Sequence, residues 1–269
     1  MAVAQIVENE ATLSHARTEY LEAGSGQPII LLHEVGFAAG GIDWRFNIDA
    51  LSACGRVLAP DFVGWGRGDR LQQEYSFAYL VDFVREFQDA LRIERAHILG
   101  QSMGGWIAGL LAYESPDRVD KLVLICAGGI TLAPGAGLID FQPPTRDQIK
   151  EMLMHRVNIP GVDFDALADR AYANTQAPGA ADAHVRVLNH MGTPETRQRY
   201  NLIRRLHRIK APTLVISGDH DSRLKGWQEH YQKIPGARME VVPDAGHFVS
   251  AEKPDEFNAL VTGFLSGGV

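Results

Sequence analysis

The sequence predicts an α/β fold, in which a mostly parallel sheet carries helices on both faces and further helices are inserted late in the chain. Two observations predict this architecture. Short runs rich in Val, Ile and Leu alternate with stretches of helical periodicity, which is the pattern of repeated βαβ units. Between residues 128 and 209 this alternation stops, and Pro and Gly separate helical stretches that contain no strand pattern. We therefore expect one core, formed by residues 1–127 and 210–269, and a helical cap inserted at residues 128–209.

The expected strands are short apolar runs. Residues 28–33 form a nearly continuous apolar run, as in a strand that is covered on both faces of a sheet. Similar runs occur at residues 56–61, 96–100 and 121–126, and at the starts of the segments 212–221 and 239–248. These runs are the expected successive strands of one sheet.

The expected helices lie between these strands and within the insertion. Ser76 is a suitable N-cap, because its hydroxyl can accept a hydrogen bond from the first turn of the helix. The apolar residues that follow at helical spacing, and that should face the sheet, are Leu80, Phe83, Val84, Phe87 and Leu91. Residues 103–113 form a second core helix. Within the insertion, helical stretches are expected at residues 143–154, 164–172 and 193–207.

The turn between the strand at 96–100 and the helix at 103–113 contains the pattern Gly-x-Ser-x-Gly. Its residues are Gly100, Ser102 and Gly104. In a strand–turn–helix context this pattern is typical of a nucleophile elbow, a strained turn that exposes the serine hydroxyl at the edge of the sheet. The glycines let strand, turn and helix approach closely, because they carry no side chains. We therefore expect Ser102 to be a catalytic nucleophile.

Partners for this serine follow later in the chain. The apolar run that begins at Pro212 leads into Asp219 and Asp221, and the run that begins at Met239 leads into His247. In nucleophilic catalysis an imidazole takes the proton of the serine, and a carboxylate orients that imidazole. His247 is therefore the expected general base, and either aspartate could orient it.

The order serine, aspartate, histidine resembles that of the α/β-hydrolase family, whereas chymotrypsin-like and subtilisin-like enzymes order their triads differently. The resemblance covers nearly the whole chain. It implies the α/β-hydrolase fold, with a helical cap in which the substrate is selected. It also favours Asp221 over Asp219, because the acid of this family commonly lies three residues after a strand-ending glycine, here Gly218.

The resemblance further implies an oxyanion hole made of two backbone N–H groups. One belongs to Met103, the residue after the nucleophile. The second comes from a loop that usually reads His-Gly-x-Gly in this family and that reads His33-Glu34-Val35-Gly36 here, so Val35 is the matching donor. Glu34 replaces a glycine, and it either points to solvent or is a residue that contacts the substrate or has a shifted pKa.

Within the family, the chain most resembles the meta-cleavage-product hydrolases, which split a carbon–carbon bond in vinylogous 1,5-diketones. The similar stretches are residues 47–51, 59–66, 102–105 and 165–172. In the last of these, Arg170 matches a cap arginine that contacts the dienoate substrate in those enzymes. Two further departures surround the pocket: Gln101 replaces an asparagine, and Phe248 replaces a tryptophan. The implied substrate-binding residues are Glu34, Gln101, Trp106, Arg170 and Phe248.

Three functions therefore stay open. A carbon–carbon hydrolase is favoured by Arg170, which would bind the carboxylate of a dienoate. A carboxylesterase or lactonase acting on a small apolar ester would use the same triad and would need no such arginine. A non-hydrolytic member of the family, a ligand-binding protein or a lyase, is the third alternative.

Composition excludes several other classes of function. The chain has 269 residues, 45% of them hydrophobic, and its formal charge of −7 argues against binding to nucleic acid or to an anionic membrane. Cys54 and Cys126 cannot form a disulfide framework, and there is no dense Cys/His cluster typical of a metal site. We expect a cytoplasmic enzyme without a cofactor or metal, whose partner is a small-molecule substrate; a homodimer stays open.

Overall fold

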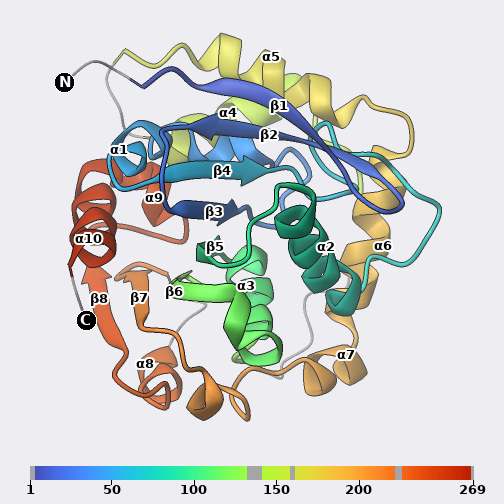
Figure 1. Cartoon of the computed structure of the whole chain (residues 1–269). Helices are drawn as coiled ribbons and strands as arrows, with labels where there is room; N and C mark the ends of the chain where they lie inside the picture. The colour runs from blue at the N-terminus through green and yellow to red at the C-terminus, as the bar shows by residue number, and fades with distance from the viewer. Residues whose placement is uncertain (1–3, 132–140, 158–160, 222–225, 268–269) are drawn as a thin grey trace.

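The computed structural model describes residues 4–131, 141–157, 161–221 and 226–267. Within these residues, eight strands form one sheet in the order β1-β2-β4-β3-β5-β6-β7-β8 (Figure 1). Their bounds are β1 Val7–Thr12, β2 Arg17–Ala23, β3 Pro28–Leu32, β4 Arg56–Pro60, β5 Ala96–Gln101, β6 Val119–Ile125, β7 Thr213–Gly218 and β8 Arg238–Val242. The pairs from β4 to β8 are parallel, and only β1 and β2 run antiparallel to their neighbours. This sheet confirms the expected α/β fold.

The N-terminal hairpin of β1 and β2 was not expected from the sequence. β1 is an edge strand, and its acidic residues Glu8 and Glu10 interrupt any apolar pattern. Charged residues are common on edge strands, because they discourage pairing with other chains. The apolar-run signal therefore found the buried strands and missed this exposed one.

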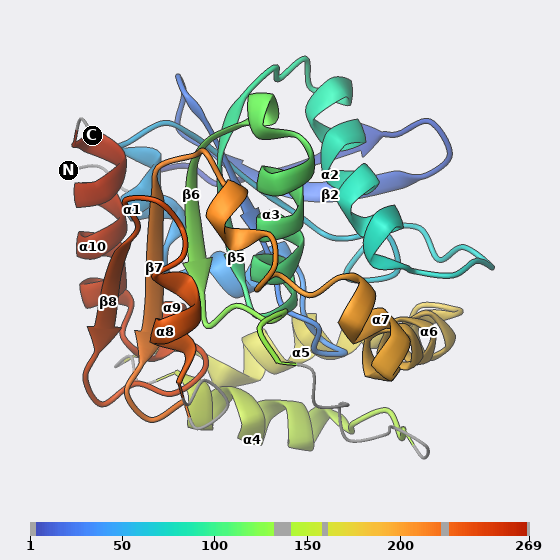
Figure 2. The same cartoon turned by 90° about the horizontal axis from the view of Figure 1, so that it is seen from below.

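The core helices lie on both faces of the sheet. Helices α2 and α3 lie on one side, and α1 and α10 lie on the other (Figures 1 and 2). The core helices are α1 Ile48–Ser52, α2 Phe77–Ala90, α3 Met103–Glu114, α8 Trp227–Tyr231, α9 Val249–Glu252 and α10 Pro254–Ser266. Short 3₁₀ turns occur at η1 Gly41–Trp44, η2 Pro116–Arg118 and η3 Leu206–Arg208.

Helix α2 forms as its sequence predicts. The side-chain oxygen of Ser76 accepts a hydrogen bond from the Tyr79 N–H at 3.2 Å, as an N-cap should. Four of the five apolar residues expected to face the sheet, Leu80, Phe83, Val84 and Phe87, are buried. The fifth, Leu91, lies just beyond the helix as its C-cap residue.

Among the described residues between β6 and β7, where the sequence predicted a cap, there are four α-helices. They are α4 Arg146–Arg156, α5 Phe164–Thr175, α6 Ala180–Gly192 and α7 Pro194–Arg199. Helices α4 and α5 lie across the end toward which the parallel strands point (Figure 2). This is the end at which α/β proteins generally bind their ligands.

Two details of this insertion differ from the expectation. Helix α6 was not predicted, because three of its four buried residues, Ala180, Ala183 and His184, are small or polar and give a weak apolar pattern. The stretch 193–207 is not one helix, since α7 ends before Tyr200. The Leu202 N–H donates to the Gly129 carbonyl at 2.7 Å, so a tertiary hydrogen bond replaces helix continuation there.

None of the helices in the described part of the chain is both long enough and apolar enough to span a membrane.

Candidate active site

Ser102 lies in the sharp turn between β5 and α3, as the elbow pattern predicts. Its φ of 53° is in the left-handed region, which is strained for a residue with a side chain. The neighbouring positions must be glycine, because there is no room for a side chain. A Cβ at Gly100 would lie 2.3 Å from the Gly104 carbonyl oxygen, and one at Gly104 would lie 2.2 Å from the Leu32 carbonyl oxygen.

His247 and Asp221 form a pair at the same edge of the sheet. Asp221 lies just after β7, His247 lies in the loop before α9, and Asp221 Oδ2 is 2.5 Å from His247 Nδ1. The side chain of Asp221 is 1% exposed. Because the carboxylate of Asp221 accepts a hydrogen bond from Nδ1–H, the neutral ring carries its lone pair on Nε2. That atom is buried and has no hydrogen-bond partner among the described residues, so it can accept a proton.

Asp219, the alternative acid, has a different role. Its Oδ1 accepts a hydrogen bond from the Ala245 N–H at 3.3 Å, two residues before His247. The two aspartates therefore contact the histidine loop differently: Asp219 contacts its backbone, and Asp221 contacts the imidazole.

Gln101, expected to bind substrate, connects the elbow to the histidine loop. Its Nε2 donates to the His247 carbonyl at 3.1 Å, and its Oε1 accepts from the Ser250 hydroxyl at 2.6 Å. Both ends of the amide are thus used inside the protein. Gln101 positions the backbone of His247, although it also lines the adjacent cavity.

The loop after β3 is held by His33. Its Nε2 accepts from the Phe62 N–H at 3.0 Å, so the proton lies on Nδ1 and is donated to the Glu34 carbonyl at 2.7 Å. Burial lowers the pKa of His33 to about 4 and keeps the ring neutral. Since the 34–35 peptide is trans, the Val35 N–H points away from His33.

Glu34 lines the cavity and does not point to solvent. It is 8% exposed, and its Oε2 accepts from the Gly36 N–H at 2.7 Å. Its Oε1 lies 3.5 Å from Nη1 of Arg156, in the last turn of α4. Of the two orientations that the sequence left open, the structure has the one that brings a carboxylate into the cavity.

Two cavities lie between the core and the cap helices. The first, of about 440 Å³, is bordered by Gln101, Phe248 and Ser250 and so lies beside the His247 loop. The second, of about 550 Å³, extends under α4 and α5. The side chains of its apolar wall include Phe37, Ile42, Ile149, Met152, Leu167 and Ala171. The first cavity is therefore bordered largely by polar and charged side chains, and the second is largely apolar.

Trp106 and Arg170, two predicted substrate-binding residues, make their polar contacts with other residues of the protein. Trp106 is 1% exposed, its Nε1 donates to the Tyr200 carbonyl at 2.8 Å, and its ring packs 4.1 Å from that of Phe77. Trp106 is therefore a core residue that anchors the chain after α7. Its indole N–H is used inside the protein, because a tryptophan one turn into α3 packs against Phe77.

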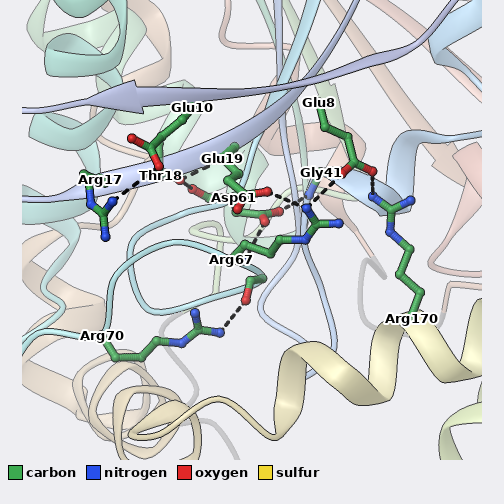
Figure 3. A network of polar contacts seen from close by, with 11 residues as sticks. Glu8, Glu10, Arg17, Thr18, Glu19, Gly41, Asp61, Arg67, Arg70 and Arg170 are labelled. Atoms are coloured by element: carbon green, nitrogen blue, oxygen red, sulfur yellow. Dashed lines mark hydrogen bonds and ion pairs between the residues drawn. The ribbon is translucent and has the colours of Figure 1, made fainter.

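Arg170 forms an ion pair with Glu8 on the edge strand β1 (Figure 3). Glu8 also pairs with Arg67 at 2.8 Å. Arg170 does not line either cavity beside Glu34. The position that matched the family's cap arginine therefore carries an arginine that connects α5 to the N-terminal hairpin.

Arg156, at the end of α4, does line the first cavity, and no sequence pattern had pointed to it. Its guanidinium lies 3.6 Å from the ring centroid of Phe248, the residue after His247. A basic residue at the end of a helix is ordinarily explained by the helix dipole. Only the folding of α4 over the histidine loop makes Arg156 part of the site.

One group of side chains in the described residues has the spacing of metal ligands: Cys126, Asp221 and His247. Asp221 and His247 are already bonded to each other. Burial raises the pKa of the Cys126 thiol to about 12, so it stays protonated at neutral pH and is a poor metal ligand. These three residues are therefore a poor fit for a metal site.

Comparison with known proteins identifies the family. The model of the alpha/beta hydrolase family matches residues 29–260. The 2-hydroxy-6-oxo-6-phenylhexa-2,4-dienoate hydrolase of Burkholderia cepacia is 31% identical over 282 residues, which cover 97% of this chain and 95% of that protein. A 2-hydroxy-6-oxononadienedioate/2-hydroxy-6-oxononatrienedioate hydrolase of Comamonas testosteroni is also 31% identical, over 97% of this chain and 95% of its own length.

Solved structures agree. A meta-cleavage product hydrolase from Pseudomonas fluorescens IP01 has a TM-score of 0.81 and 30% identity, and the match covers 95% of this chain and 96% of that one. These relatives are hydrolases, which argues against the non-hydrolytic alternative. The chain belongs to the alpha/beta hydrolase family and is a hydrolase similar to the meta-cleavage product hydrolases.

Proposed function

We propose that the chain is a serine hydrolase that cleaves a carbon–carbon bond in a vinylogous diketone of the meta-cleavage-product type. The observation that carries this proposal is the His247–Asp221 pair, 2.5 Å apart and at the same sheet edge as the Ser102 elbow. Within the described part of the chain, Nε2 of His247 has no hydrogen-bond partner. The similarity to dienoate hydrolases over nearly the whole chain supports the choice of substrate class.

In the proposed mechanism, His247 takes a proton from Ser102 or from a water molecule as the nucleophile attacks the substrate carbonyl. Asp221 orients the imidazole and balances the charge that it gains. The carbonyl oxygen becomes an oxyanion, which the N–H groups of Val35 and Met103 stabilise. For carbon–carbon cleavage, the dienol first ketonises, the carbon–carbon bond breaks, and the leaving carbon takes the proton held by His247. Where Ser102 is the nucleophile, a water molecule activated by His247 then hydrolyses the acyl-enzyme and releases the acid.

The test compares two substrates on the same protein. Wild type and Ser102→Ala are assayed with 2-hydroxy-6-oxo-6-phenylhexa-2,4-dienoate and with para-nitrophenyl acetate. We expect dienoate turnover with a kcat/KM at least about a hundredfold above that for the ester, and nearly complete loss in Ser102→Ala. Ester turnover without dienoate turnover would contradict carbon–carbon hydrolysis. Full activity of Ser102→Ala would contradict the nucleophile assignment.

A carboxylesterase or lactonase is the second candidate. Two observations favour it: Arg170 is paired with Glu8, and Glu34 places a carboxylate in the cavity. A carboxylate in the cavity disfavours an anionic substrate and favours a neutral ester. The same pair of assays separates the candidates, because an esterase would prefer para-nitrophenyl acetate.

A further inference from the structure

Four charged side chains meet where the two cavities adjoin. Glu34 follows β3, Asp43 lies in η1, Arg45 follows η1, and Arg156 ends α4. All four line both cavities. A ligand that extends from the histidine loop to the apolar space under α4 and α5 must therefore pass these charges, which we call the charged quartet.

Several hydrogen-bond donors around the first cavity lack a partner among the described residues. The polar contact of Arg156 is with Glu34 at 3.5 Å, which leaves most of its guanidinium N–H groups available. Arg45 donates from Nη1 to the Ile42 carbonyl at 2.8 Å, but its Nε is buried and unpartnered. Nε1 of Trp44, a residue that is 1% exposed and lines this cavity, is also unpartnered.

Buried donors without acceptors are costly, and native proteins rarely leave them so. Two such groups around one cavity, on Arg45 and Trp44, together with the available N–H groups of Arg156, indicate that an acceptor with negative charge completes the site. A carboxylate suits this geometry, because a guanidinium binds it through two parallel hydrogen bonds.

The acids of the quartet determine its net charge. Glu34 accepts from the Gly36 N–H and faces Arg156, and Asp43 accepts from the Gly40 N–H at 3.3 Å. Burial and the negative charge of Glu34 raise the pKa of Asp43 to about 7, against the opposing effects of Arg45 and Arg156. The quartet then carries one net positive charge below neutral pH and none above it.

We propose that Arg156 and Arg45, with the indole N–H of Trp44, bind a carboxylate of the substrate, and that Asp43 adjusts the charge of this subsite. The inference rests on the proposed function in one respect, namely that the substrate occupies the first cavity. It replaces Arg170 by Arg156 as the carboxylate-binding cap arginine of this chain. At higher pH both acids of the quartet are ionised. With the substrate carboxylate bound, the negative charges in the subsite then exceed the positive charges of the two arginines, so anionic ligands bind more weakly.

A binding experiment that needs no turnover tests the subsite. Sorbate, a dienoate that cannot be hydrolysed, and the neutral hexa-2,4-dien-1-ol are titrated into wild type, Arg156→Gln and Arg170→Gln by calorimetry at pH 6. Arg170→Gln is the matched control, since it removes the other cap arginine. We expect Arg156→Gln to weaken sorbate binding at least about tenfold and to leave binding of the alcohol within about twofold. Arg170→Gln should change neither.

Other results would overturn the proposal. These are an equal loss of both ligands in Arg156→Gln, no loss of either, no binding of sorbate to wild type, or a selective loss of sorbate in Arg170→Gln. Arg156→Lys provides a second variant if the glutamine disturbs the cap; it keeps one charge and should retain part of the sorbate affinity.

The role of Asp43 has its own readout. In wild type, sorbate binding should weaken at least about fivefold between pH 6 and pH 8, and in Asp43→Asn this dependence should disappear. An unchanged pH dependence in Asp43→Asn would overturn its role. Because sorbate binding requires no catalysis, these results are independent of whether the protein cleaves a dienoate, so failure of the proposed function is distinguishable from failure of the subsite.

Discussion

The carboxylate of Glu34 occupies the space that a side chain at position 36 would need. A Cβ on Gly36 would lie 2.3 Å from Glu34 Oε1, and the Gly36 N–H donates to Oε2 at 2.7 Å. The loop that supplies the proposed oxyanion donor Val35 is thus stabilised by a carboxylate folded over a glycine.

This relationship predicts coupling between the two residues. Gly36→Ala should displace the Glu34 carboxylate and lower kcat at least about tenfold, because the loop carries the Val35 N–H. In the double variant Glu34→Gly/Gly36→Ala the clash is absent, so much of the activity should return. Steady-state kinetics of the two single variants and the double variant measure the coupling. Strictly additive losses would contradict it.

Gln101 should act through His247. Gln101→Met keeps the size of the side chain but removes its hydrogen bonds to the His247 carbonyl and to Ser250. We expect kcat to fall about tenfold or more while KM changes less than about twofold, since the imidazole is displaced and the substrate cavity is not. Ser250→Ala, which removes only one of the bonds, should have a smaller effect. A raised KM with normal kcat would instead indicate substrate binding by Gln101.

Substitutions of the two aspartates after β7 should have clearly different effects on kcat. Asp221→Asn removes the charge that orients His247 and should lower kcat by about 10⁴, as it does when a triad acid is replaced. Asp219→Asn alters a contact to the Ala245 backbone and should change kcat by less than about fivefold. Thermal unfolding of both variants provides the control for folding. The reverse order of kinetic effects would identify Asp219 as the acid.

His33 should make the stability of the fold depend on pH. Its pKa is lowered by burial to about 4, whereas an unfolded histidine titrates near 6.5. The unfolded chain therefore binds more protons between these values, and stability is lost as the pH falls from about 6.5 to about 4, by on the order of 3 kcal/mol. Urea unfolding of wild type and His33→Gln across this range measures the effect.

His184, whose pKa burial also lowers to about 4, contributes to the wild-type slope with the same sign. The contribution of His33 is thus the difference between the two slopes. Parallel slopes for wild type and His33→Gln would show that His33 is not kept neutral by the fold.

Local sequence determined the buried framework and the elbow. Buried parallel strands such as β3 and β5 must be apolar along their whole length, and the turn at Ser102 admits only glycine at positions 100 and 104. Ser76 likewise marked the start of α2 by its own hydrogen bond. These signals are contained within a few neighbouring residues, so they can be read without knowledge of the rest of the chain.

The tertiary structure alone decided which charged groups enter the cavity. Arg156 and Glu34 are 122 residues apart in the sequence and meet because α4 folds over the loop after β3. Arg170 of α5 and Glu8 of the N-terminal hairpin are 162 residues apart and meet each other instead. Both arginines lie on short helices of the insertion, and neither has a local feature that indicates its partner. Ion pairs depend on the distance between segments after packing, which the order of residues within a helix does not specify.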